Sequence, residues 1–317
     1  MGRLASVIRS TWKLAWGSPW THDALDPSRP LAVPLEPLGP WYYDMGRSID
    51  RGDYHLFDAQ GIPRLCMRGA VVYHPSRIAS FSIAHVTRYV LEGNPEDREK
   101  ALRGARWLVD QQVGEGALEG AFPFSFEIDG LPPPWASALT QGLGLSALAR
   151  AHLLTGEAAF AEAAVRGLAP FRRDIREGGV RSRFHGSVSV WYEEFPRPSD
   201  PSHVLNGYVY GLWGLRDVAL LGLAPGAEEL YRDGLASLAE HLPAFDRGYW
   251  SNYDCPDRTR PRAASLFYHH LHGVMMRVLS RIEGEGVFGR MAARWESNVP
   301  RPWCRLRTML AKLGDYH

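Results

Sequence analysis

The sequence predicts a mainly α-helical fold, an incomplete (α/α) barrel of about four helical hairpins with a small β-hairpin region near the N-terminus. From about residue 77 onward, apolar residues recur at helical spacing. Pairs of such helical patterns, each joined by a short glycine-containing turn, recur roughly every 60 residues, a period too long for common short helical repeats. Each pair is followed by a loop rich in aromatic residues, glycine and proline.

The first part of the chain predicts irregular and β structure. Residues 1–40 form an N-terminal arm and a proline-rich lead, PSRPLAVPLEPLGP, which cannot be helical because proline lacks the backbone N–H. Residues 41–317 are expected to form a single barrel domain. It begins with a β-hairpin at about 41–68, where an aromatic stretch is broken by glycine-containing turn signals.

The helical part divides into hairpins that begin near residues 77, 137, 203 and 265. In each hairpin the first helix is rich in small, aromatic and polar residues, and the second is an ordinary amphipathic helix. We therefore expect the first helices to line the interior of the barrel. The long loops should then gather at one mouth and form a cleft. These loops span residues 115–135, 176–202 and 246–262.

The overall composition excludes several classes of protein. The chain has 317 residues, 45% of them hydrophobic, and a net charge of +1, too small for a strong nucleic-acid-attracting field. It contains no apolar run of the ~18–20 residues that a membrane span requires. Three cysteines far apart in sequence indicate reduced thiols. Because the N-terminus also lacks the pattern of a secretory signal, we expect a cytoplasmic protein.

The densest cluster of chemical groups lies in WYEEFPRPSDPSHVLNGYVYGLWGLRD, which starts at Trp191. A loop this rich in aromatic side chains and carboxylates is more typical of a binding surface than of a structural loop. Glu193 and Glu194 are adjacent, and neighbouring residues on an extended strand point to opposite faces. Only one of the two carboxylates is therefore expected to reach the cleft, and we favour Glu194.

Histidines follow a tyrosine at the start of the last hairpin, in FYHHLH. His269 and His272 share one face of a helix, as zinc ligands would. However, the HExxH pattern is missing, and zinc would not explain Tyr268 immediately before them. We therefore predict hydrogen-bonding histidines of a site, with core or surface histidines as the alternative. The sequence predicts no metal and no cofactor.

The motifs WYEEFP, VLNGYVYGLWGLRD, NYD and YHHLH occur in an order similar to that of the C-terminal catalytic domain of D-glucuronyl C5-epimerases. These enzymes act on the glycosaminoglycans heparosan and heparan sulfate. The resemblance extends from about residue 41 to residue 296. It includes Pro75 with Ile78 and Ala79, and Trp107 with Gln111. The β-rich region that precedes this domain in animal members has no counterpart here, so we expect a compact bacterial member that forms a homodimer.

The resemblance implies a uronate C5-epimerase that converts D-glucuronate to L-iduronate within an acidic polysaccharide. One face of the sugar loses the C5 proton and the opposite face is reprotonated. It implies Glu194, Tyr253 and Tyr268 as catalytic residues. A tyrosine can act as a base near neutral pH only if cations or histidines favour its phenolate. The residues implied in substrate binding are Trp135, Gln141, Trp191, Tyr192, Phe195, Asn206, Arg258, His269 and His272.

Phe195 departs from the family pattern, which has a tyrosine at this position in WYEEYP. A phenyl ring can stack on a sugar but cannot transfer a proton. Tyr192, Tyr249 or Glu194 would then have to replace the missing hydroxyl. Two alternatives to the epimerase therefore remain, a lyase acting on uronate polymers and a non-catalytic protein that binds acidic glycans.

Overall fold

The computed structural model describes residues 30–128 and 130–314 of the chain. Residues 1–29 of the expected N-terminal arm lie outside this part. Within it, the mainly α-helical prediction is confirmed, since helices dominate and the strands form two small sheets. None of the helices in these two ranges is both long enough and apolar enough to cross a membrane.

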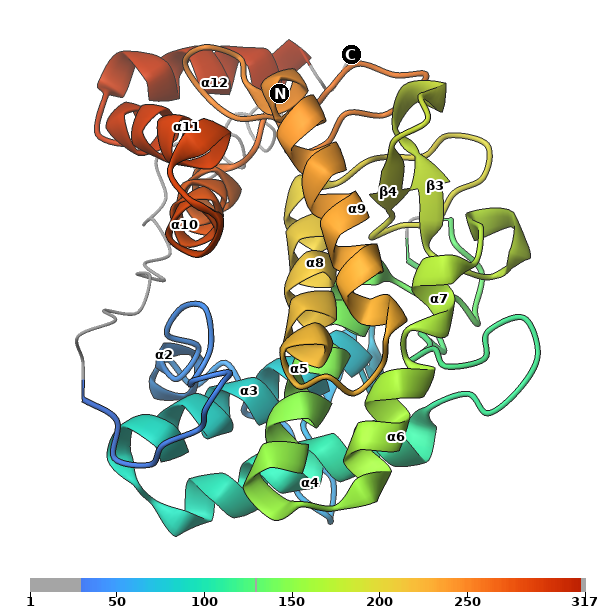
Figure 1. Cartoon of the computed structure of the whole chain (residues 1–317). Helices are drawn as coiled ribbons and strands as arrows, with labels where there is room; N and C mark the ends of the chain where they lie inside the picture. The colour runs from blue at the N-terminus through green and yellow to red at the C-terminus, as the bar shows by residue number, and fades with distance from the viewer. Residues whose placement is uncertain (1–29, 129, 315–317) are drawn as a thin grey trace.

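Four helical hairpins form the body of the fold (Figure 1). The first helices of successive hairpins, α3, α5, α8 and α10, contact one another in this order, as expected for the inner layer of an incomplete (α/α) barrel. The hairpins are α3 (Pro75–Glu92) with α4 (Pro95–Gln111), α5 (Ala138–Thr155) with α6 (Ala158–Arg166), α8 (Leu205–Leu220) with α9 (Gly226–His241), and α10 (Leu266–Glu283) with α11 (Gly286–Asn298).

The remaining elements lie before, between and after the hairpins. They are the helices α2 (Arg47–Asp50), α7 (Ala169–Arg172) and α12 (Pro302–Gly314), the 3₁₀ helices η1 (Ile175–Glu177), η2 (Phe184–Gly186) and η3 (Leu242–Phe245), and the strands β1 (Leu65–Met67), β2 (Ala70–Val72), β3 (Arg181–Arg183) and β4 (Val190–Tyr192). Strands β1 and β2 are antiparallel, as are β3 and β4, and Ser182 pairs with Trp191.

The β-hairpin lies at the end of the range 41–68 that we predicted, with β1 inside this range and β2 just after it. It is formed by β1 and β2, and it turns at Arg68 and Gly69, both with positive φ. The residues before it form a loop with the short helix α2. Trp41 and Tyr43 are buried in the main core, so the aromatic pattern of this segment reflects packing against the helices and not the two faces of a sheet.

Small residues let helices α5 and α8 approach each other closely. A Cβ atom on Gly142 would collide with the backbone carbonyl of Tyr210, and one on Gly214 with the backbone of Gly142. Gly142 and Gly214 therefore serve backbone contact between the two helices. This explains why these helices combine glycine with large aromatic residues.

The variant Gly142→Ala is expected to lower the free energy of unfolding by roughly 3 kcal/mol, because a backbone carbonyl cannot move aside as a flexible side chain can. Chemical denaturation monitored by circular dichroism measures this. Gly114→Ala is the control, since nothing lies within 4 Å of a Cβ at that position. Equal stability of the two variants would contradict this account of the packing.

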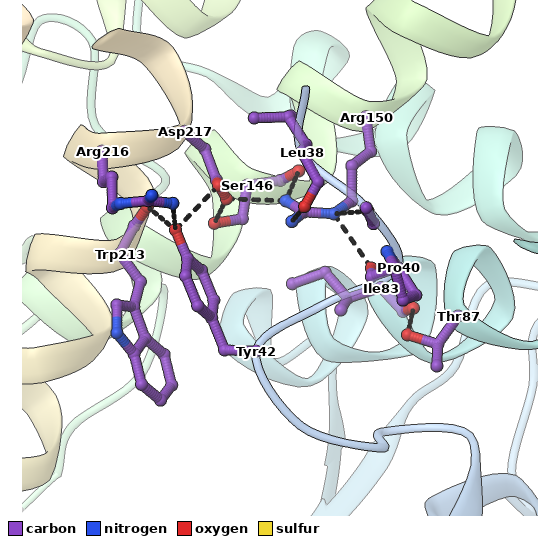
Figure 2. Close-up of polar contacts among 11 residues, drawn as sticks. Leu38, Pro40, Tyr42, Ile83, Thr87, Ser146, Arg150, Trp213, Arg216 and Asp217 are labelled. Carbon is purple, nitrogen blue, oxygen red and sulfur yellow. Dashed lines mark hydrogen bonds and ion pairs between the residues drawn. The ribbon is translucent and has the colours of Figure 1, made fainter. Parts of the chain in front are cut away.

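A buried ion pair joins the two central helices to the proline-rich lead (Figure 2). Nη1 of Arg150 lies 2.6 Å from Oδ2 of Asp217, and both side chains are buried. The Tyr42 hydroxyl donates to Oδ1 of Asp217 over 2.9 Å. Nε of Arg150 donates to the carbonyl oxygen of Pro40 over 3.0 Å. Because the paired charges of Arg150 and Asp217 are also hydrogen-bonded to the lead and to Tyr42, the network fixes where the lead crosses the barrel.

Candidate active site

A cavity of about 410 Å³ lies between the N-terminal loop and the inner helices α3, α5, α8 and α10. Its wall combines aromatic, apolar, cationic and amide side chains, a mixture typical of ligand-binding sites. The lining residues are Tyr43, Met45, Ser48, Asp53, Tyr54, Leu65, His74, Ser76, Arg77, Ser80, Leu139, Leu143, Asn206, Tyr210, Phe267, Tyr268 and Leu271.

The structure brings Glu194 to the edge of this site. The side-chain amide of Asn206, which lines the cavity, donates to Oε2 of Glu194 over 3.3 Å. Gly207 allows this approach, because a Cβ there would collide with the Glu194 side chain. Burial raises the pKa of Glu194 to about 8, and the charges of Glu193 and Asp254 act in the same direction. This carboxyl group can therefore exchange a proton near neutral pH.

Tyr253 and Tyr268 lie together, with ring centroids 4.7 Å apart. Tyr268 is in the first turn of α10, where its backbone N–H is capped by Oγ of Ser265. Burial and then the charge of Glu194 raise the pKa of Tyr268 to about 12, and the same two causes raise the pKa of Tyr253 well above its usual value. Both phenols are therefore protonated at neutral pH and are suited to donate a proton.

His269 and His272 lie in the core behind the site. The hydroxyl of Ser251 is 2.9 Å from Nδ1 of both histidines, and Nε2 of His269 is 3.1 Å from the carbonyl oxygen of Trp295. Burial lowers the pKa of His272 to about 3 and that of His269 well below its usual value. These neutral histidines hold the segment before Tyr253 and lack the positive charge that would favour a phenolate.

Three other predicted binding residues have interior partners. Trp191 stacks between Tyr208 and Phe245, with centroid distances of 3.8 and 5.5 Å. The Tyr192 hydroxyl donates to the carbonyl oxygen of Leu230 over 2.9 Å. The Gln141 side chain bonds only backbone groups, those of Phe122, Gly120 and Gly167. These contacts support the scaffold of the site and leave none of the three on the cavity wall.

Trp135 and Phe195 connect two of the predicted loops. Their ring centroids are 6.2 Å apart, and Trp135 stacks on Phe124 at 4.2 Å. A β-bridge between Val204 and Asp254 joins the segment after the second loop to the third. The loops therefore meet next to Glu194 and Tyr253.

Among the described residues, the arginine that lines the main cavity is not the predicted Arg258. That residue is exposed and lines a separate cavity of about 270 Å³. Arg77, at the start of α3, lines the main cavity, and its guanidinium lies 4.9 Å from the centre of the Tyr54 ring. Among the described residues, its buried Nε atom has no hydrogen-bond partner. Arg77 lies between Pro75 and the pair Ile78 and Ala79, all of which belong to the family resemblance. This position in the sequence could have identified Arg77 as a site residue.

Sequence reasoning also missed two tyrosines in the cavity wall. The hydroxyls of Tyr43 and Tyr210 form a hydrogen bond with each other. By contrast, Tyr249, proposed as a substitute for the hydroxyl missing at Phe195, has its ring covered by Arg307 at 4.1 Å. Tyr43 and Tyr210, which line the cavity, are therefore better placed to supply hydroxyl groups to a ligand there.

Comparison with known proteins identifies relatives of the chain. The family model described as D-glucuronyl C5-epimerase C-terminus matches residues 115–297. The chain is 29% identical over 290 residues to D-glucuronyl C5-epimerase of Caenorhabditis elegans, covering 82% of this chain but 45% of that protein. An uncharacterized protein of Methanocaldococcus jannaschii is 25% identical over 217 residues, covering 64% of this chain and 69% of that protein. The solved structure of unsaturated glucuronyl hydrolase from Bacillus sp. GL1 is 15% identical, with a TM-score of 0.47 over 80% of this chain and 64% of that one.

Proposed function

The chain belongs to the D-glucuronyl C5-epimerase C-terminus family, and we propose that it epimerises uronate residues at C5 within a glucuronate-containing polysaccharide. One observation carries the proposal. A carboxyl group whose pKa is raised to about 8, that of Glu194, lies beside the protonated phenols at a cavity lined by Arg77. A base, a proton donor and a cation are the three groups that this reaction requires.

In the first step, the Glu194 carboxylate takes the proton from C5 of the glucuronate. The electron pair of the broken C–H bond moves into the adjacent carboxylate of the sugar, which then carries a second negative charge. The guanidinium of Arg77, which lines the cavity, stabilises this charge through charge-assisted hydrogen bonds. Without such a cation, the C5 proton would be far too weakly acidic for a carboxylate base.

In the second step, C5 receives a proton on its opposite face. We assign this donation to Tyr268, because it lines the cavity and Tyr253 lies behind it. Hydrogen bonding from Tyr253 opposes the rise in the pKa of Tyr268 and so favours release of its proton. The product is an L-iduronate residue. The tyrosinate regains its proton from protonated Glu194 through solvent, which restores the starting state.

Incubation with glucuronate polymers in heavy water tests this proposal. We expect deuterium at C5 of both glucuronate and iduronate residues in a polymer such as heparosan, measured by NMR. A protein that leaves C5 unlabelled in every glucuronate polymer tested is not an epimerase. Ultraviolet absorbance of an unsaturated uronate would identify a lyase instead, and polymer binding without any turnover would identify a glycan-binding protein.

A further inference from the structure

A second cluster of chemical groups lies beside the segment that carries Glu194. Nδ1 of His185 is 3.1 Å from Oδ1 of Asp257, and Nε2 of His203 is 2.9 Å from the same oxygen. The three ligand atoms lie within 4.8 Å of one another. Ligand atoms bound to tetrahedral zinc at ~2.0–2.1 Å are separated by roughly 3.3 Å. We propose that His185, His203 and Asp257 bind a divalent transition-metal ion, with zinc as the preferred ion.

The chemistry of the three ligands selects the metal. Two imidazole nitrogens and one carboxylate oxygen suit zinc and its neighbours, whereas calcium and magnesium prefer sites made of oxygen atoms. Asp257 also lines the cavity of about 270 Å³, together with Gly186, Ser182 and Arg183. This polar space has room for a water molecule as the fourth ligand.

His203 is held as a metal-ligating histidine usually is. It is fully buried, and its Nδ1 lies 2.7 Å from Oε1 of Glu193, so that Nε2 faces Asp257. Glu193 is itself fixed, because it accepts from Oγ of Ser182 over 2.6 Å and from the backbone N–H of His203 over 3.0 Å. A carboxylate behind a ligating imidazole sets the ring orientation and raises its basicity.

The backbone provides an independent observation. His185 and His203 have φ values of 46° and 47°, in the left-handed region that residues other than glycine rarely adopt. Such conformations persist where other interactions determine them, and they gather at ligand-binding positions. Here they occur in two separate segments, and both direct an imidazole to Asp257.

The proposed ion would stabilise the loops around the active site without taking part in the reaction. His185 lies in the turn between β3 and β4, His203 precedes α8, and Asp257 follows the segment of Tyr253. Backbone hydrogen bonds join the last two, such as the 3.2 Å bond from the N–H of Asp257 to the carbonyl oxygen of Pro201. A metal bound to all three segments would fix Glu193, and with it the position of Glu194.

The test uses the full chain, stripped of metal with a chelator and then dialysed against zinc. We expect one zinc per chain by elemental analysis, and a rise in Tm of roughly 5 °C at zinc concentrations a hundredfold above Kd. Cobalt should give the visible absorption bands of a tetrahedral site with nitrogen ligands. This spectrum tests the ligand set in the unmodified protein, independently of any variant.

The variants His185→Ala and Asp257→Asn remove one ligand each at partly exposed positions, so both should fold. Zinc affinity is expected to fall by more than the roughly 10–100-fold loss typical of removing a residue behind a ligand. His55→Ala, an exposed histidine outside the cluster, should bind zinc as the unmodified protein does. Zinc binding that is absent, or equal in all variants, would overturn the proposal. The cluster would then be a protonated His203 between two carboxylates.

Discussion

Replacing Glu194 by glutamine is expected to lower kcat by about 10²–10⁴-fold, the usual contribution of a general base. An amide cannot accept the C5 proton, but it has nearly the same shape and can still contact Asn206. The rate of deuterium incorporation at C5 measures the effect directly. Glu162→Gln, at an exposed position of α6, is the matched control and should leave the rate unchanged.

The pH dependence of kcat/KM, measured for the unmodified protein and for the same variant, tests the role of Glu194 independently. Burial raises the pKa of Glu194 to about 8, so kcat/KM should increase as pH rises through that value and the base loses its proton. This limb of the profile should disappear in Glu194→Gln. A variant that keeps both the limb and a rate within tenfold of the unmodified protein would show that another group removes the proton.

The free energy of unfolding should also depend on the proton of Glu194, but it should fall as pH rises. Between the usual carboxyl pKa and about 8, the folded protein holds the Glu194 proton and the unfolded chain does not. The contribution of this residue to the free energy of unfolding therefore falls as pH rises across that interval. Glu194→Gln should flatten the decrease, which can be measured by denaturant unfolding at several pH values.

The helical hairpins could be predicted from the sequence because their apolar residues repeat at helical spacing over long segments. The exact bounds of the β-hairpin could not be predicted, since β1 and β2 have three residues each and no clear alternation. Such short strands are defined by the turn at Arg68 and Gly69 and by packing elsewhere. The local pattern of apolar residues therefore located the long helices but did not define the ends of the short strands.

The sequence pattern also could not tell which individual residues face the cavity. A dense group of aromatic side chains marks a buried core as well as a binding surface, and all three residues of β4 are buried. Trp191 and Tyr192 were thus indistinguishable by sequence from residues that face the cavity. Glu193 and Glu194 differ because their partners differ, His203 in one case and Asn206 in the other.

The prediction of Arg258 as a binding residue relied on its position in the sequence. Arg258 attracted attention because it follows the NYD motif, whereas Arg77 belongs to the first hairpin, far upstream. Only the curvature of the barrel brings the start of α3 to the same cavity as α8 and α10. Contacts of this kind depend on how the hairpins pack, which periodicity within one helix does not encode.

Arg77→Gln is therefore expected to lower kcat/KM by about 10²–10³-fold, the loss typical of removing a group that stabilises developing charge. Arg77→Lys should recover part of the rate, because it keeps the charge but cannot form a bidentate pair with the sugar carboxylate. Arg258→Gln is the control and should change the rate by less than about threefold, since screened surface charges contribute little. Proton exchange at C5, measured for all three variants on one glucuronate polymer, decides between the two arginines. A large loss with Arg258→Gln and none with Arg77→Gln would move the carboxylate-binding site away from the cavity and contradict the mechanism proposed for Glu194 and Tyr268.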